Sequence, residues 1–398
     1  MRSRSVHTRQ VWKTFGEYPW CESRTRLRSS HNGEVIELAE LLADLELLVN
    51  TESPSHDVAL MNTSAQTLSN VLVRRTGVHP TIVEGPVGGH VWWRGGGTPK
   101  VLIVGHHDTV FPVGTCAARP FAVSKGKATG PGVFDMKAGI VQAIHALASL
   151  SSTDGIEMLI TADEEVGSGS SRAFIEERAL ACGAVLVLEP SADGGALKTG
   201  RKGTGTFEVR VHGRAAHAGL EPEKGVNSLV AAAEVISAIN TFGDPATGTT
   251  VTPTMASSGT ADNVVPALTS VRVDVRVVAP GEKERIERSM AALSTTLPGA
   301  VIEVLGDIGR PPMFESASAT LFPLAVAAGA QLGLPAIEGV AVGGGSDGNF
   351  TAAIGVPTLD GLGAVGGGAH ADHEFVLINT MVDRSRLLAQ LLTSVAAR

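Results

Sequence analysis

The sequence of 398 residues predicts an α/β fold, a mostly parallel sheet flanked by helices, with a smaller α+β domain inserted into it. Two observations lead to this prediction. Short apolar runs that suit buried strands alternate with segments of helical periodicity, an order typical of parallel sheets covered by helices. In the middle of the chain the pattern changes to runs that alternate with period two, as expected of strands with one exposed face.

The elements of the first half follow from these patterns. Helical periodicity begins near Val35, and further helices are expected to open at Asp135 and at Ser168, the latter from small polar residues that favour helix N-caps. Buried strands are expected at 100–104, 156–160 and 184–188. Each of these runs stops at histidines or carboxylates, so we expect such side chains to gather at the carboxyl edge of the sheet.

Residues 206–310 are expected to form the inserted domain, which would divide the first domain into 31–205 and 311–398. The insert has period-two runs at 207–211 and 271–277, helical stretches at 225–240 and 281–297, and a last strand at 300–305. Its order of strand, helix, strand, strand, helix, strand is the ferredoxin-like arrangement. After it we expect a helix at 317–332 and strands at 340–342 and 357–359 that return to the first sheet.

Composition excludes several classes of protein. With 43% hydrophobic and 18% charged residues, the chain can bury a large core and does not have the composition of a disordered protein. No apolar run approaches the roughly 20 residues that span a membrane, and a net charge of −8 offers no basic surface to nucleic acid. Three scattered cysteines are too few for a disulfide framework or a thiolate zinc site. We therefore expect a cytoplasmic protein that binds neither membrane nor nucleic acid.

The first 30 residues differ from the remainder. They carry a net charge of +5, which leaves −13 for the other 368 residues. They contain no apolar segment of the kind found in a secretory signal. We interpret residues 1–30 as a basic, disordered extension or as the result of a start site assigned too early.

Side chains that bind divalent metals follow successive predicted strands. They are His106, Asp135, Glu165, Glu189 and His370. Imidazoles and carboxylates without thiolates suit Zn²⁺ or a similar ion in an open catalytic site, and more oxygen ligands than one tetrahedral zinc uses favour two ions about 3.5–4 Å apart. Singly, each residue could instead be a helix cap or an ordinary turn residue, but five at successive strand ends favour a metal site.

Five short blocks carry a family resemblance. They are Gly105–Val110, Gly130–Lys137, Thr161–Gly167, Leu188–Pro190 and Ala369–His370. In this order they resemble the signature blocks of the co-catalytic di-zinc metallopeptidases, a family that includes glutamate carboxypeptidase, acetylornithine deacetylase, succinyl-diaminopimelate desuccinylase and aminoacylase. The resemblance runs from about residue 34 onward. It is greatest to the glutamate carboxypeptidase branch, through the runs at 200–205, 216–219 and 343–347.

The resemblance implies which metal each residue binds. His106 and Glu189 would hold the first zinc ion, Glu165 and His370 would hold the second, and Asp135 would bridge the two. Co²⁺ and Mn²⁺ suit the same ligands. In the block around Asp135 the next residue is Met136 where the family has another aspartate, a departure that touches no ligand.

Two more residues of these blocks would serve the reaction without binding metal. The resemblance makes Glu164 the general base on the metal-activated water, and Asp108 the group that orients His106 from behind. Independently of the resemblance, the proton transfer in such a reaction requires one carboxylate that does not bind metal. His107, between His106 and Asp108, is interpreted as a bystander.

Substrate contacts are implied by further matches. His217 would help stabilise the tetrahedral oxyanion, while Asn263 and Arg276 would bind a substrate carboxylate, for which a bidentate arginine is well suited. Each could instead be an ordinary turn or strand-face residue. Gly344 and Gly345 would line the substrate pocket; their run formally matches a dinucleotide motif, but it lies far from the early strand–helix turn that such a site requires.

The expected reaction is metal-dependent hydrolysis of an amide bond next to a free carboxylate, in a peptide or an N-acyl amino acid. An alternative is biosynthetic deacylation, as in acetylornithine deacetylase or succinyl-diaminopimelate desuccinylase. A more remote alternative is a metal-binding scaffold without activity, which would have no use for a base at Glu164. The resemblance also implies a homodimer, with the inserted domain as lid and dimerisation surface.

Overall fold

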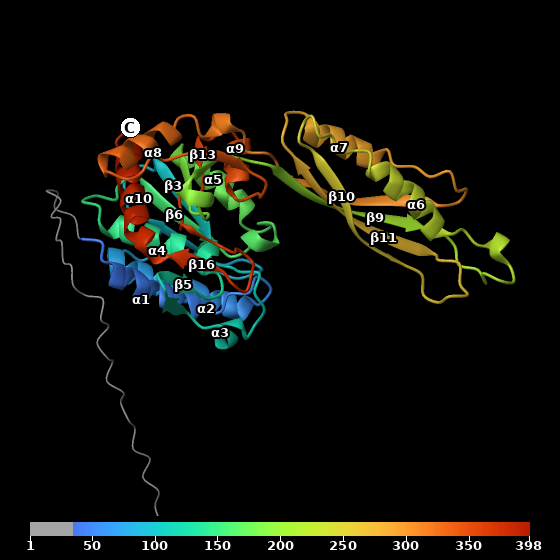
Figure 1. Cartoon of the computed structure of the whole chain (residues 1–398), viewed down its shortest axis with the longest axis horizontal. Helices are drawn as coiled ribbons and strands as arrows, with labels where there is room; N and C mark the ends of the chain where they lie inside the picture. Colours follow the sequence, from blue (N-terminus) through green and yellow to red (C-terminus); the bar gives the residue numbers. More distant parts are fainter. Residues whose placement is uncertain (1–34) are drawn as a thin grey trace, which may run out of the picture. The chain divides into compact units, whose positions relative to one another are not determined.

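The computed structural model describes residues 35–398, so the expectation for residues 1–30 lies outside the described residues. Its central sheet has six strands in the order β1-β2-β6-β3-β7-β14 (Figure 1). These are β1 (Thr81–Val83), β2 (His90–Arg94), β3 (Val101–His106), β6 (Ile156–Thr161), β7 (Val185–Val187) and β14 (Thr358–Leu359). From β6 to β14 neighbouring strands run parallel, while β1 and β2 add an antiparallel edge. The prediction of a mostly parallel sheet is confirmed.

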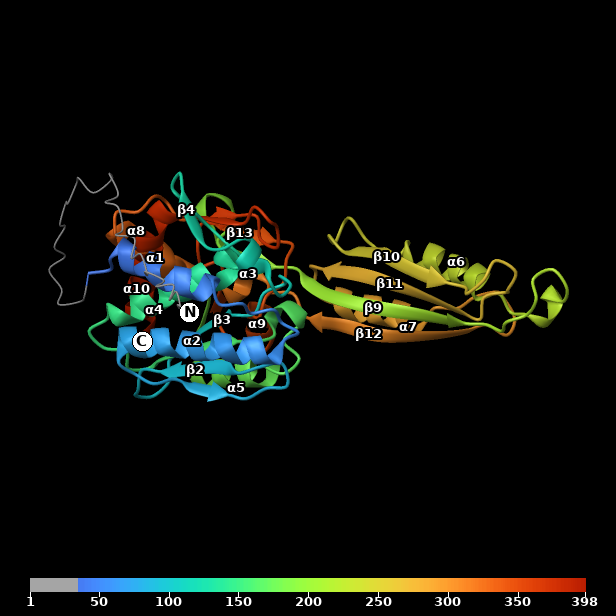
Figure 2. The same cartoon turned by 90° about the horizontal axis from the view of Figure 1, so that it is seen from below.

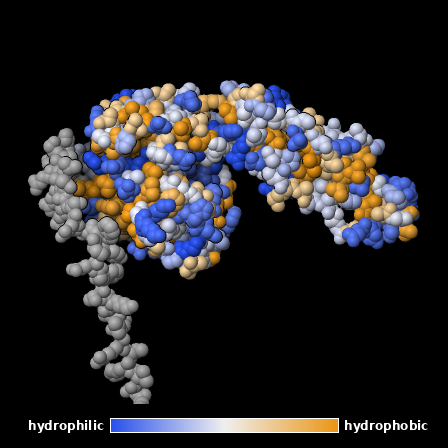
Figure 3. All heavy atoms as spheres, in the orientation of Figure 1, coloured by the Kyte–Doolittle hydropathy of each residue, from blue (hydrophilic) through white to orange (hydrophobic). Residues whose placement is uncertain are grey.

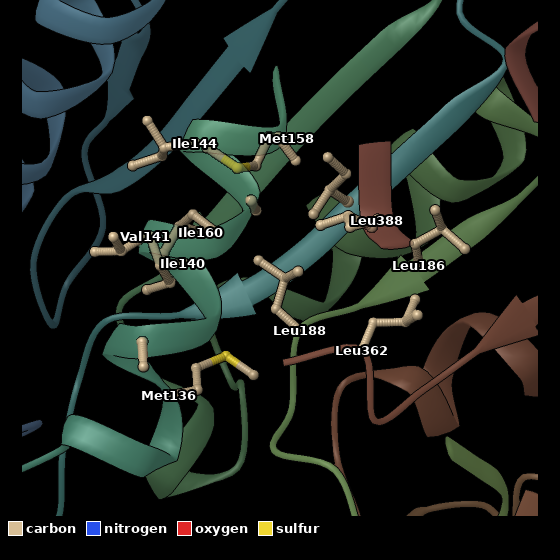
Figure 4. Close-up of a cluster of buried hydrophobic side chains, with 14 of the residues drawn as sticks. Met136, Ile140, Val141, Ile144, Met158, Ile160, Leu186, Leu188, Leu362 and Leu388 are labelled. Atoms are coloured by element: carbon tan, nitrogen blue, oxygen red, sulfur yellow. The ribbon is translucent and has the colours of Figure 1, made fainter. Parts of the chain in front are cut away.

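Helices cover both faces of this sheet, which explains the uninterrupted apolar run of β3. Val101 and Ile103 pack into one core with α1 (Leu38–Val49), α2 (Val58–Thr76), α4 (Ala138–Ala148) and α10 (Met381–Ala396). Leu102 and Val104 point the other way, into a core with α5 (Arg172–Cys182). Figure 4 shows the first core around Ile140, where side chains of α4, β6, β7 and α10 meet. The short helices α8 (Phe322–Gln331) and α9 (Gly348–Ala353) complete the covering.

A second sheet is built from residues 203–310 alone. Its strands are β9 (Gly203–His212), β10 (Thr250–Ser258), β11 (Leu268–Val277) and β12 (Val301–Arg310). They lie in the order β10-β11-β9-β12, all antiparallel (Figure 2). One face packs against α6 (Ser228–Ile239) and α7 (Glu282–Ala291), because the alternate valines of β11 point into that core. This is the predicted ferredoxin-like arrangement.

The remaining strands form two small sheets, and one of them corrects a prediction. β13 (Gly339–Val342) pairs with β8 (Leu197–Arg201) in a sheet of its own and does not return to the first sheet, whereas β14 does. The reason is that β14 occupies the edge beside β7. The other small sheet consists of β15 (Gly366–Gly367), β16 (Phe375–Leu377), β5 (Lys127–Thr129) and β4 (Ala122–Ser124), and α3 (Thr115–Ala118) precedes it.

Two helices begin later than their sequences predicted. Asp135 has a non-helical backbone, and α4 begins only at Ala138. The reason is that the carboxylate of Glu374 accepts hydrogen bonds from the backbone N–H groups before the helix, those of Gly132, Phe134 and Asp135. Similarly, α5 begins at Arg172, since Ser168 adopts a left-handed backbone conformation and stays in the preceding loop. Asp135 lies in the first of these loops, and Glu165 lies three residues before Ser168 in the second.

Within residues 35–398, helices that combine the length and apolar character needed to cross a membrane are absent.

Candidate metal centre and active site

The first group of metal-ligand side chains surrounds His106, the last residue of β3. Its Nε2 atom lies 3.3 Å from Oδ1 of Asp135 and 3.7 Å from Oε1 of Glu189. The strand ends of β3 and β7 are neighbours in the sheet, so His106 and Glu189 meet at its carboxyl edge, as predicted. One ligand atom from each of the three residues lies within 4.8 Å of the others, close enough for a single ion.

The second group lies on the other side of Asp135. The Nε2 atom of His370 is 3.3 Å from Oδ2 of Asp135 and 3.1 Å from Oε1 of Glu165. Asp135 therefore presents one oxygen to each histidine, and the two groups share it. A carboxylate that faces two ligand groups in this way suits a bridge between two ions.

The charge balance supports cations at both groups. Burial alone would lower the pKa of His106, but the carboxylates of Asp108, Asp135 and Glu189 outweigh it and hold that pKa well above its usual value. Hydrogen bonds to Asp135 and Glu165 raise the pKa of His370 to about 10. Crowded carboxylates stabilise positive charge among them, and a divalent ion supplies that charge more fully than a proton. The residues thus fit a pair of metal ions.

Asp108 fixes the first group from behind. Its Oδ1 atom is 3.3 Å from Nδ1 of His106 and accepts from the backbone N–H of Glu164, and Oδ2 accepts from Ser55 and from the N–H of Glu165. Because one buried carboxylate holds both the histidine ring and the backbone of the acidic pair, it sets their relative positions. His107 instead contacts Ser64 and the carbonyl oxygen of Gly89, and burial lowers its pKa to about 4.

Glu164 stands apart from both ligand groups although it precedes Glu165. Its carboxylate accepts a 2.6 Å hydrogen bond from Nη1 of Arg310, at the end of β12. Burial raises the pKa of Glu164 well above its usual value, against the opposing charge of Arg310. A buried carboxylate whose pKa is raised holds a proton more readily than an exposed one, which suits a general base.

Sequence reasoning missed three basic residues beside this centre. Arg310 contacts Glu164 and, through Nη2, Ser168 Oγ and Asp347. Arg201 donates to Glu189, and Lys198 Nζ lies 3.9 Å from the same carboxylate. For Arg201 the sequence offered a signal in the run Gly200-Arg-Lys-Gly203, where β8 ends and, after one residue, β9 begins.

The predicted substrate residues are only partly brought together. Gly344 and Gly345 are tied to the first group, since their carbonyl oxygens accept from Arg201. His217 and Asn263 lie in adjacent loops, joined where the N–H of Ala218 donates to the carbonyl of Asn263. Within residues 35–398, the hydrogen bonds and bridges of these two residues stay inside the loops of the second sheet.

Arg276 lies at the opposite end of the second sheet from His217. In β11, Arg276 pairs with Thr204 near the start of β9, whereas Leu268 pairs with His212 at its end. The Arg276 guanidinium donates to Asp274 on the same face, at 2.9 and 3.1 Å. One chain therefore does not assemble His217, Asn263 and Arg276 in one place.

An α/β sheet with two metal-ligand groups about a shared aspartate, and a separate buried carboxylate beside them, defines a metallohydrolase. A model of the peptidase family M20/M25/M40 matches residues 102–394. The chain belongs to this family and is a metallopeptidase. The family resemblance predicted from the sequence blocks is confirmed.

Two relatives and one solved structure support this assignment. Carboxypeptidase G2 of Pseudomonas sp. (strain RS-16) is 32% identical over 377 residues, which cover 90% of this chain and 89% of that protein. Succinyl-diaminopimelate desuccinylase of Caulobacter vibrioides is 29% identical over 307 residues, 71% of this chain and 78% of that protein. The structure of the M20 family metallo-carboxypeptidase Sso-CP2 from Sulfolobus solfataricus shares the fold, with a TM-score of 0.73 at 16% identity over 90% of this chain and 100% of that one.

Proposed function

We propose that this metallopeptidase uses two zinc ions to hydrolyse the amide bond next to a free carboxylate in a small peptide or an N-acyl amino acid. The observation that carries the proposal is the position of Asp135, whose two oxygens face two separate histidine–carboxylate groups. His106 and Glu189 would hold the first ion, Glu165 and His370 the second, with Asp135 between them. Co²⁺ or Mn²⁺ would fit the same ligands.

The chain's own residues would divide the remaining work. Glu164, which is buried and outside both ligand groups, would take the proton of the attacking water and pass it to the leaving amine. Asp108 would keep Nε2 of His106 aimed at the first group by holding its Nδ1 side. When bound, the two ions would supply Lewis-acid activation of water and positive charge beside the developing oxyanion.

The carboxylate of the substrate would be bound by Arg276, with Gly344 and Gly345 lining the pocket. Asn263, which lies at the other end of the second sheet, would reach this carboxylate only from a second subunit, as proposed below. Arg276 already holds a carboxylate, that of Asp274, in a two-pronged contact, so its geometry suits this task. Similarity to carboxypeptidase G2 along 90% of the chain favours a substrate ending in an amino acid with a free carboxylate. Similarity to succinyl-diaminopimelate desuccinylase keeps deacylation of an N-acyl amino acid as the second candidate.

A homodimer would complete the site. The ten residues of β9 separate His217 from the end of the sheet that adjoins Glu164, and ten strand residues span about 33 Å. His217 and Asn263 would therefore act in the active site of the partner subunit.

The free thiols of Cys116 and Cys182 accord with a reducing compartment, and we propose the cytoplasm.

The test combines elemental analysis with a substrate screen. We expect two divalent ions per chain and loss of activity on chelation, with recovery when Zn²⁺ is returned. Dipeptides ending in glutamate should be cleaved faster than acetylornithine or succinyl-diaminopimelate. One ion per chain with full activity would contradict the two-metal proposal, preference for an acyl substrate would favour deacylation, and absence of turnover in every metal-loaded form would favour the scaffold.

A further inference from the structure

Arg201, the last residue of β8, uses every hydrogen-bond donor of its side chain on the protein. A guanidinium has five N–H groups in a fixed plane. Nε and Nη2 donate to the two oxygens of Asp360 at 2.7 and 3.0 Å, and Nη2 also donates to Oε2 of Glu189 at 3.1 Å. Nη1 donates to the carbonyl oxygens of Gly344 and Gly345 at 2.9 and 3.2 Å. The side chain is buried, so this network replaces all of its hydration.

Asp360, which follows β14, is saturated in the same way. Besides the two bonds from Arg201, one of its oxygens accepts from Ser346 Oγ at 2.6 Å and the other from the N–H of Gly361. The carboxylate is fully buried. Because all four lone pairs of the carboxylate accept hydrogen bonds, Asp360 fixes the plane of the Arg201 guanidinium. The second N–H of Nη2 then points in one fixed direction, toward Glu189.

We propose that Arg201 is a positioning residue that holds Glu189 for the first metal ion and joins the glycine loop at Gly344 to that ion's site; this rests on the two-metal proposal above. Arg201 binds Oε2 of Glu189, and the other oxygen, Oε1, is the one that faces His106. A carboxylate held by one oxygen presents the second with a defined direction, which is how groups behind a metal ligand tune its affinity.

The same contacts separate Arg201 from a substrate-binding role. With five donors used and the side chain buried, it has no free N–H for a substrate carboxylate. Lys198, whose Nζ is 3.9 Å from Glu189, has the weaker contact of the two. A lysine at position 201 would keep the charge but not the planar fork, so it could not serve Asp360, Glu189 and the glycine carbonyls together.

Arg201→Lys tests the proposal, with Arg178→Lys as the matched control. Arg178 makes a comparable two-pronged bond to Glu157, at 2.9 Å to each oxygen, away from the metal-ligand groups. Each substitution is made in full-length chains carrying His370→Ala, which retain only the first ligand group intact, and in chains carrying Glu189→Ala, which retain only the second. Metal-free protein is titrated with Zn²⁺, and Kd is measured by competition with a chelating indicator.

We expect Arg201→Lys to weaken Zn²⁺ binding about 10- to 100-fold in the His370→Ala chains, the usual effect of losing a partner behind a metal ligand. In the Glu189→Ala chains it should change Kd less than twofold, because the residue through which Arg201 acts is already gone. Arg178→Lys should leave Kd unchanged in both. A general loss of packing would not select one ligand group, so the selectivity separates positioning from stability.

Equal effects of Arg201→Lys and Arg178→Lys, or equal effects in the two backgrounds, would overturn the proposal. Should Arg201→Lys fail to fold, Asp360→Asn loosens the guanidinium from its other side and should weaken the first group selectively as well; unchanged Zn²⁺ binding in Asp360→Asn would equally overturn it. The number of ions bound by the wild-type chain is measured before any variant. If it is fewer than two, the two-metal proposal itself fails, and this failure is distinct from a failure of the Arg201 proposal.

Discussion

Glu164 and Glu165 are adjacent in the sequence, but their different surroundings at the sheet edge suit them to different chemistry. Glu165 contacts His370 and belongs to the second ligand group. Glu164 points to Arg310 and belongs to neither group, and burial raises its pKa. Both backbone amides donate to Asp108, so the pair is held rigidly while the two side chains diverge. A base that keeps out of the metal shell can exchange protons without releasing an ion.

Replacing each member of the pair should therefore have a different effect. We expect Glu164→Gln to retain two ions per chain and to lower kcat by about 10²–10⁴-fold, the usual contribution of a general base. Glu165→Gln should lose one ion. Elemental analysis and steady-state kinetics on the same preparations check both statements, and the reverse pattern would show that the two roles are exchanged.

Arg276 is expected to recognise the free carboxylate of the substrate. Arg276→Ala should raise KM for substrates with a free α-carboxylate far more than for the matching amides, since a hydrogen bond to a charged group contributes about 1.5–3 kcal/mol. Arg272→Ala is a suitable control, because Arg272 lies on the same face of β11 but is exposed. Equal effects on acid and amide substrates would assign Arg276 to the strand surface only.

Among the elements, α1, α2 and α4 are joined by one buried carboxylate. Asp44 of α1 accepts hydrogen bonds from Arg74 and from Arg75 Nε at 2.6 Å on α2, and contacts His145 Nε2 at 2.8 Å on α4. Burial alone would raise the pKa of Asp44, but the bonds from His145 and Arg75 outweigh it and lower the pKa to about 2. These helices cover the sheet face that carries the larger core.

This network makes a pH-dependent contribution to stability. The folded pKa of about 2 lies below the ordinary value of 3.8, so the stabilisation is present above about pH 4 and is lost as pH falls toward 2. The difference corresponds to about 2 kcal/mol at pH 7. Asp44→Asn should lower the free energy of unfolding by about that amount at pH 7 and by much less near pH 2.

Denaturant titrations at several pH values measure this difference. Asp383→Asn, a substitution of a half-exposed aspartate on α10, should change stability by less than about 0.5 kcal/mol at every pH, as is usual for surface sites. A constant difference between wild type and Asp44→Asn over the whole range would show that packing, and not ionisation, is what Asp44 contributes.

At the scale of the molecule, the homodimer proposed above would use exposed apolar side chains of the second domain. β10 is an edge strand of that sheet, and Met255 on it is 70% exposed. On the neighbouring α6, Leu229 and Val230 are each 51% exposed, and Figure 3 shows hydrophobic atoms gathered where α6 lies. Exposed apolar side chains beside an unpaired strand edge favour association with a second chain.

Mixing two inactive variants tests whether His217 acts across such a dimer. Glu164→Gln lacks the proposed base and His217→Ala lacks the proposed oxyanion contact, and each alone should be nearly inactive. After chain exchange in an equal mixture, about half of the dimers are mixed, and each mixed dimer has one intact site of two. Activity should approach about a quarter of the wild-type level. Confirmed exchange without any recovery would show that His217 does not act in the partner subunit.

The sequence by itself determined the fold class and the metal-ligand candidates, for a local reason. Buried parallel strands read as short apolar runs, and the residues that follow them share one sheet edge whatever the details of packing. His106, Glu165 and Glu189, which come at or after the ends of β3, β6 and β7, could thus be expected to meet before their distances were known. The order of strands and helices in residues 203–310 likewise determined the ferredoxin-like domain.

Only the tertiary structure decided which side chains hold the metal-ligand candidates and Glu164 in place. Arg201 and Asp360 are 159 residues apart in the sequence, and Arg310 and Glu164 are 146 apart, so no local pattern links them. The late start of α4 depends on Glu374, whose carboxylate captures amides about 240 residues away. The placement of β13 beside β8 was also decided by which sheet edge remained available. Periodicity specifies an element and its buried face, whereas contacts between distant buried charges follow from how the finished elements pack.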